Sequence, residues 1–379
     1  MADANHDLTE LLRQPGPWTT VLTDGRGERP QQEEVAKIRA VTDPLGDAGA
    51  PEADVQAVGE ALTAGDGLPS PSTRYLLVRD GDVVIDEAFT GQRLGAEVLA
   101  HGAAPRILPL LRHRASAVRY LVVETAREGA RLSVREAHRG DDGATQEIEG
   151  RTDSLNKVQA GGWSHRRYQN HSEDIWQHNQ AEVADAVDRL VRERRPRFVV
   201  VAGDVRARQL LLERLAPPSR ELALEVDAHT KAEGSADEAL ERAIDDAVGG
   251  AIGADIADAR RRAAENDGAA GARGIGEVID ALQQARVDTL VLDARLADEG
   301  EDGEALAALD AEPWVARSER EELPAGSLGY LPAAEALARA ALLSGARVLV
   351  VEEDLAEGEA RDDRPAAEPV AALRWADGG

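Results

Sequence analysis

The chain has 379 residues, of which 42% are hydrophobic, so two or three domains with buried cores are expected. It contains no cysteine, which excludes disulfide bonds, thiolate zinc sites and a cysteine nucleophile. Because no apolar run is long enough to span a bilayer and no leader-like segment opens the chain, we expect a cytoplasmic protein without a membrane partner.

The charge of the chain is strongly acidic but unevenly distributed. The formal net charge is −27, from 71 acidic and 44 basic residues, which favours solubility and argues against DNA as a partner. Residues 151–220 hold 13 Lys and Arg against 9 Asp and Glu, so this segment is +4 and the rest is −31. A basic centre between acidic flanks suits a protein that contacts RNA through one part. A genome bias or a salty cytoplasm would explain the total charge but not its distribution.

Residues 1–115 have the pattern of a small α+β domain. In chain order the expected elements are a strand (17–24), a helix (30–41), a loop (43–51), a second helix (52–65) and a hairpin (74–89). Asp80-Gly81 is a typical turn for that hairpin. Gly102, Pro105 and Pro109 mark the expected boundary of this domain.

Residues 116–226 predict a central sheet with covering helices. The expected elements are two strands around a turn (117–137), a polar connection (138–151), a long helix (172–195), a buried strand (197–204) and a further helix (205–215).

Residues 227–379 alternate helices with apolar strands, which predicts an α/β sandwich as the third domain. The expected elements are an Ala-rich helix (235–265), a helix (275–285), a strand (287–296), an acidic loop, a helix (331–346) and two strands (347–355 and 369–375). The fold class is therefore α/β with three domains.

The segment 159–179 concentrates side chains suited to RNA. Two adjacent glycines permit a loop tip that approaches another surface closely, and the Trp, Tyr and Arg residues that follow can stack on bases and pair with phosphate. The candidate RNA-binding residues are Gly161, Gly162, Trp163, Ser164, His165, Arg166, Arg167, Tyr168, Arg194 and Arg195. The alternative is a plain surface loop before an amphipathic helix, whose last arginines complement the helix dipole.

Motifs for nucleotide, metal and triad chemistry are weak. Gly271, Gly274 and Gly276 match no phosphate-loop spacing, and no expected strand directly precedes them. The three His residues of the central segment (His165, His171, His178) stand six and seven apart, so no pair shares a helix face as zinc ligands would. Ser164-His165 lacks the third member of a triad. No cofactor, metal ion or catalytic residue is therefore expected.

The order of these parts resembles the bacterial branch of the archaeal and eukaryotic class-1 release factor and Pelota superfamily. The resemblance covers about residues 117–379, and residues 1–100 lack the stop-codon motifs of release factors. It rests on GIGEVIDALQQARVDTLVLDARL (274–296), LLSGARVLVVEEDLAEGE (342–359), PVAALRW (369–375) and GGWSHRRYQ (161–169). Within this branch the chain looks most similar to the Balon-like, mycobacterial-type ribosome hibernation factors, which belong to stress responses.

One departure from the superfamily pattern bears on function. Release factors carry Gly-Gly-Gln in this loop, and the glutamine helps to arrange water for hydrolysis of peptidyl-tRNA. Here Trp163 stands in its place, and an indole has one hydrogen-bond donor and no acceptor. The resemblance thus implies a factor that occupies the ribosomal A site and places Gly161, Gly162 and Trp163 near the peptidyl transferase centre without hydrolysis. It also implies elongation factor Tu as a candidate partner.

Two other interpretations stay open at this stage. A peptidyl-tRNA hydrolase or a rescue factor on stalled ribosomes would use loop N–H groups to stabilise an oxyanion and His165 to handle the proton. An acidic scaffold that kept the fold but lost the ribosome would use none of these residues.

Overall fold

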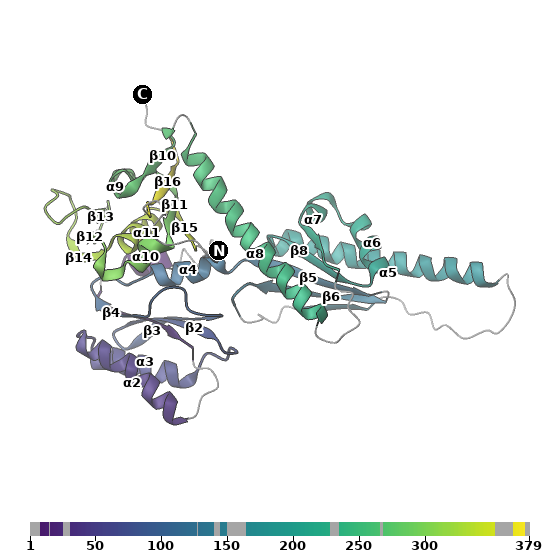
Figure 1. Cartoon of the computed structure of the whole chain (residues 1–379), viewed down its shortest axis with the longest axis horizontal. Coiled ribbons are helices and arrows are strands. Elements are labelled where there is room, and N and C mark those ends of the chain that lie inside the picture. Colours follow the sequence, from purple (N-terminus) through teal and green to yellow (C-terminus); the bar gives the residue numbers. More distant parts are fainter. Residues whose placement is uncertain are drawn as a thin grey trace, which may run out of the picture. The chain divides into compact units, whose positions relative to one another are not determined.

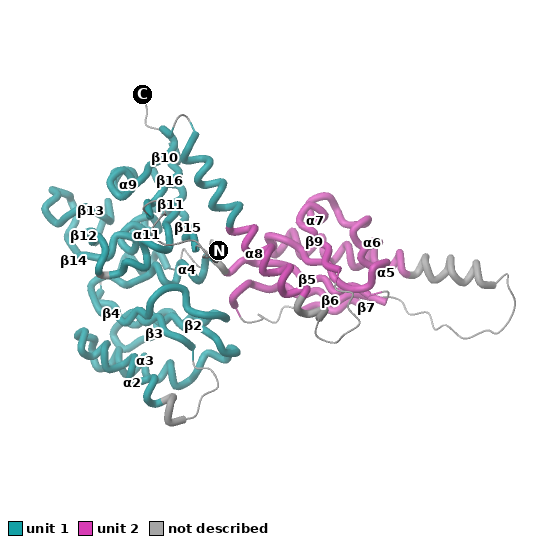
Figure 2. Tube along the Cα trace, in the orientation of Figure 1, with its two compact units in different colours: residues 1–115, 253–379 teal, residues 116–252 magenta. Residues whose placement is uncertain are grey.

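The computed structural model describes nine stretches of the chain: residues 8–14, 16–25, 31–126, 128–139, 145–149, 164–227, 235–265, 268–352 and 367–375. For residues 31–34, 116, 149, 164–175, 235–238 and 301 only the backbone is described. The chain forms two compact units (Figure 2): unit 1 comprises residues 1–115 and 253–379, and unit 2 comprises residues 116–252. The α/β fold class is confirmed, and the division into three domains stays a prediction.

The first sheet of unit 1 is antiparallel, in the order β3-β2-β1-β4. Its strands are β1 (Trp18–Asp24), β2 (Ser72–Arg79), β3 (Asp82–Thr90) and β4 (Val98–Gly102). The predicted hairpin is confirmed, since β2 and β3 pair across Asp80 and Gly81, whose φ values of 54° and 83° match a tight turn. Strand β4 was not predicted.

Helices α2 (Gln31–Asp47) and α3 (Glu52–Ala64) lie together on one face of this sheet (Figure 1). The loop predicted for 43–51 is wrong in its first half, because α2 continues through Pro44 to Asp47. Leu45 is fully buried in the cluster under the sheet, and this burial outweighs the unfavourable proline.

The second sheet of unit 1 has the order β10-β16-β11-β15, with β11 and β15 parallel. Its elements and helices are β10 (Gly271–Arg273), α9 (Gly274–Gln283), β11 (Val287–Asp293), α10 (Ala294–Asp298), α11 (Ala333–Leu343), β15 (Arg347–Val351) and β16 (Val370–Leu373). The predicted acidic loop instead contains a short helix, η2 (Gly300–Asp302), and a small antiparallel sheet of β12 (Ala305–Leu309), β13 (Val315–Ala316) and β14 (Ser327–Pro332). Its short alanine-rich and glycine-containing strands carry little β signal.

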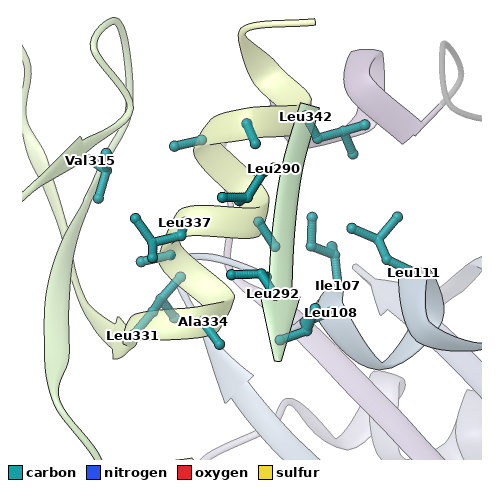
Figure 3. Close-up of a cluster of buried hydrophobic side chains, with 14 of the residues drawn as sticks. Ile107, Leu108, Leu111, Leu290, Leu292, Val315, Leu331, Ala334, Leu337 and Leu342 are labelled. Carbon is teal, nitrogen blue, oxygen red and sulfur yellow. The ribbon is translucent and has the colours of Figure 1, made fainter. Parts of the chain in front are cut away.

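One hydrophobic core joins the N-terminal and C-terminal parts of unit 1. Helix α4 (Leu108–Ser116), where the sequence predicted only a domain boundary, contributes to this core together with β11 and α11. In Figure 3, Ile107 and Leu111 lie on one side of β11 and Leu337 lies on the other. Pro109 stands in the first turn of α4, where a proline fits a helix.

A buried carboxylate fixes the start of α4. Glu335 of α11 is 5% exposed, and its Oε1 accepts hydrogen bonds from the N–H groups of Ile107 and Leu108, the latter at 2.9 Å. A helix begins with N–H groups that lack partners within the helix, so this carboxylate satisfies two of them. This contact joins α4 and α11, although the two residues are more than 200 positions apart in the sequence.

Unit 2 is a sheet with helices on both faces, in the order β7-β6-β5-β8-β9 (Figure 1). Its elements are β5 (Arg119–Ala126), β6 (Gly129–Glu136), β7 (Thr145–Glu149), α5 (Ser164–Arg194), β8 (Val199–Gly203), α6 (Val205–Arg214), α7 (Pro217–Glu221), β9 (Ala223–Glu225) and the first part of α8 (Ser235–Ala263). Alternate residues of β5 explain the two faces: Leu121 packs with α5 and α6, whereas Val122 packs with α8. Among the described helices, none has a stretch apolar enough to cross a bilayer.

Candidate RNA-binding site

The predicted loop tip lies between two elements of unit 2. Residues Gly161 to Trp163 fall outside the described residues, but β7 ends at Glu149 and α5 begins at Ser164. The helix starts eight residues earlier than Ser172, where we predicted it. The first turns of α5 therefore contain five of the candidates, Ser164, His165, Arg166, Arg167 and Tyr168. For these five residues the structure describes the backbone alone.

Helix α5 is fixed to the sheet at its middle. Gln180 is fully buried; its Oε1 accepts from the Thr125 hydroxyl at 2.9 Å, and its Nε2 donates to the carbonyl of Ala126 at 2.8 Å. Apolar side chains from Val183 onward pack against the sheet. At a rise of about 1.5 Å per residue, Ser164 stands about 24 Å along the helix axis from Gln180. The helix thus sets the distance between the sheet and Ser164, the residue that follows Trp163.

The other two candidates, Arg194 and Arg195, stand at the opposite end of α5. Arg194 is its last residue, and Arg195 follows it with a φ of 48° and an N–H bond to Val191 O at 3.1 Å. Both are exposed. About 30 residues at about 1.5 Å each place Arg194 about 45 Å from Ser164. The structure therefore does not bring the ten candidates together into one site, and their contact with RNA stays a prediction.

Several charged side chains near the sheet edge are already engaged. Arg131 donates to Glu147 at 2.9 Å, and that interaction raises the pKa of the Arg131 guanidinium. His178 lies 3.3 Å from Glu182, one turn further along α5, and both side chains are about half exposed. Among the described residues, no group of three or more His, Asp and Glu side chains is arranged to hold a metal ion.

The three glycines considered as a phosphate loop fall in two elements. Gly271 begins β10 (Gly271–Arg273), and Gly274 and Gly276 lie in the first turn of α9, so the expectation of no preceding strand is wrong for the last two. The first turn of α9 is nevertheless occupied by its own carboxylate, since Glu277 accepts from the N–H of Arg273 at 2.9 Å. A phosphate at this helix start would meet that negative charge, so the site is poorly suited to a nucleotide.

One family model matches the central part of the chain. Residues 119–273 match the family model of the bacterial archaeo-eukaryotic release factor family 2. This span includes Gly161, Gly162 and Trp163, all of α5 and the strands of the unit 2 sheet. The central part of the chain is thus release-factor-like, while the match does not define a subfamily. No curated protein matches the chain.

Three solved structures show low similarity to the chain. The archaeal termination factor aRF1 is 16% identical, with 99% of this chain and 98% of that chain covered and a TM-score of 0.24. Archaeoglobus fulgidus Pelota is 15% identical, with 100% and 94% covered and a TM-score of 0.37. S. cerevisiae Dom34 is 10% identical, with 80% and 81% covered and a TM-score of 0.39. The similarity to release factors therefore rests on the family model, which matches residues 119–273, less than half of the chain.

Proposed function

We propose that this chain is a cytoplasmic, ribosome-binding hibernation factor that occupies the A site without hydrolysing peptidyl-tRNA. The observation that carries the proposal is a tryptophan, Trp163, in the position of the release-factor glutamine, within the span that matches the release-factor family. The N-terminal domain would lie near the decoding centre, and the C-terminal domain near the base of the ribosomal stalk, where elongation factor Tu is a candidate partner.

The chemistry of the loop supports binding rather than hydrolysis. A glutamine amide has both a carbonyl acceptor and N–H donors, so it can orient an attacking water, whereas the indole of Trp163 has a single N–H donor. An indole instead has a large face that stacks on a nucleobase, for about 1 to 3 kcal/mol per base. Arg166 and Arg167 supply planar cations for the rRNA phosphates next to that base.

The geometry of unit 2 is consistent with a projecting contact. The loop follows an edge strand, β7, and precedes α5, whose first buried and hydrogen-bonded anchor is at Asn179 and Gln180 among the described side chains. A helix of several turns before its anchor can carry a loop tip well beyond the sheet. Such reach is what insertion into a deep RNA pocket requires.

Co-sedimentation with vacant ribosomes over a salt series tests the proposal. The native protein is expected to co-sediment, and Trp163→Ala and the double variant Arg166→Ala/Arg167→Ala are expected to bind more weakly, with a smaller salt dependence for the arginine variant. The matched control is Arg206→Ala/Arg214→Ala, which removes the same charge from exposed positions on α6. Equal binding by all four proteins would contradict the assignment of the loop.

A second assay separates hibernation from hydrolysis. Ribosomes that carry labelled peptidyl-tRNA are incubated with the native protein and with Gly162→Ala, His165→Ala and Trp163→Gln. Hibernation predicts little peptide release by the native protein, so the first two changes have nothing to abolish, and Trp163→Gln is the one variant that can gain release. Release by the native protein that Gly162→Ala or His165→Ala abolishes would identify a peptidyl-tRNA hydrolase or a rescue factor instead.

A further inference from the structure

Five exposed arginines gather at one end of unit 2, and we refer to them as the arginine patch. They are Arg119, Arg192, Arg194, Arg195 and Arg197. Arg119 begins β5 and Arg197 directly precedes β8, and these strands run parallel, so their first residues are neighbours. The N–H of Arg197 donates to the carbonyl of Arg119 at 2.8 Å, and Arg119 Nη1 lies 3.5 Å from the carbonyl of Arg194. These two hydrogen bonds connect the three segments of the patch.

Two of the five guanidinium groups have partners within the chain. Arg119 lies 3.4 Å from Glu136, which also lies 3.5 Å from Arg139, and Arg197 Nη2 donates to the carbonyl of Ala251 at 3.5 Å. Glu193 is the one acidic residue in the segment 190–197. Across the described part of the chain, the guanidinium groups of Arg192, Arg194 and Arg195 make no hydrogen bond or ion pair. A concentration of cations in a chain of net charge −27 is unusual and needs a physical reason.

The helix dipole explains only part of this arrangement. Cations in the last turn of a helix interact favourably with its carbonyl end, and this applies to Arg192 and Arg194. Arg119 and Arg197 lie outside α5, in different segments of the chain, and the dipole gives no reason for cations there. A ligand with several negative charges accounts for all five arginines at once.

We propose that the arginine patch binds the phosphate backbone of RNA, at a contact separate from the Gly-Gly-Trp loop. Guanidinium groups are planar and permanently charged, and they pair with phosphate through two parallel N–H bonds. The patch lies at the far end of α5, about 45 Å from Ser164, so one helix spaces two RNA contacts. The choice of RNA as the polyanion rests on the proposed function.

Fluorescence anisotropy with a labelled short duplex RNA, over a potassium chloride series, tests the patch in the full-length protein. The variant Arg192→Gln/Arg194→Gln is expected to bind the RNA about tenfold more weakly at low salt. The slope of its plot of log affinity against log salt concentration is expected to be smaller in magnitude by about two, or about one for each lost phosphate contact. The control Arg206→Gln/Arg214→Gln removes equal charge from α6 and should retain the native affinity and slope. Far-UV circular dichroism checks that both variants fold.

Three outcomes would overturn the proposal. In the first, the two double variants weaken RNA binding equally, which would mean a net-charge effect. In the second, both double variants bind RNA as tightly as the native protein. In the third, labelled polyglutamate binds the patch while RNA does not, which would mean an acidic protein partner. Co-sedimentation separates these results from the proposed function. Native protein that pellets with ribosomes while the patch variant keeps full RNA affinity refutes only the patch, whereas patch-dependent RNA binding without ribosome binding refutes only the hibernation role.

Discussion

Replacing Glu335 by glutamine is expected to remove a pH dependence from the stability of unit 1. Burial raises the pKa of the Glu335 carboxyl to about 7, although the N–H groups of Leu108 and Ile107 and the nearby Arg106 and Arg339 favour the charged form. Because the folded pKa lies above the ordinary value of 4.5, the folded protein holds a proton that the unfolded chain has already released. Folding stability therefore falls as the pH rises from 4.5 to about 7, and then becomes level with respect to this group.

The size of the effect follows from the two pKa values. The interval from 4.5 to about 7, at about 1.4 kcal/mol per pH unit, corresponds to about 3 kcal/mol. Roughly 2 to 3 kcal/mol of this falls between about pH 5 and about pH 8. A glutamine at position 335 keeps a carbonyl oxygen for the two N–H groups of α4 but has no proton to lose, so its stability should not change with pH for this reason.

Urea denaturation of the native protein and of Glu335→Gln, at several pH values between about 5 and about 8, measures this difference. The native protein should lose stability relative to the variant as the pH rises. The eight histidines of the chain also titrate in this range, but they are common to both proteins and cancel in the comparison. The control Glu322→Gln, at an exposed position, should follow the native protein throughout. Parallel curves for the native protein and Glu335→Gln would refute the reasoning.

Carboxylates with lowered pKa values do not interfere in this window. A hydrogen bond from Arg262 holds the pKa of Asp288 below its ordinary 3.8. Such a group contributes stability above its unfolded pKa, and that contribution is lost only as the pH falls through the lower folded value. Its effect therefore lies below about pH 4.

Three further substitutions test the packing. Arg112→Gln should lower the free energy of unfolding, measured by urea titration, by about 1 to 3 kcal/mol. The buried guanidinium of Arg112 donates to Glu352 at 2.8 and 2.7 Å and to Asp298 at 2.6 Å, while those carboxylates remain partly hydrated. An unchanged urea midpoint would contradict the importance of this bridge. Gln180→Ala should lower the stability of unit 2 by about 1 to 3 kcal/mol in thermal unfolding, because a buried threonine hydroxyl and a carbonyl lose their partner. Leu337→Ala should lower the free energy of unfolding, measured by urea denaturation, by about 2 to 5 kcal/mol, because it leaves a cavity in the core of unit 1. A loss below about 1 kcal/mol would mean that neighbouring side chains move to fill this cavity.

Local sequence pattern was sufficient for many elements. The hairpin around Asp80 and Gly81 follows from a turn dipeptide between β-rich runs, and α9 with β11 follows from a change of apolar spacing. These signals depend on neighbours within a few residues. They failed where burial decided the outcome, as in α2, which continues past Pro44 because Leu45 packs under the sheet.

By itself the sequence determined the chemistry of the candidate loop, because the lack of an acceptor on the Trp163 indole and the charge of Arg166 and Arg167 are properties of the side chains. Only the tertiary structure decided which distant residues meet. Glu335 completes the start of α4 across more than 200 residues, and Arg119 lies beside Arg194 through the pairing of β5 with β8. Such contacts depend on the closure of long chain segments around a shared core, which no local pattern encodes.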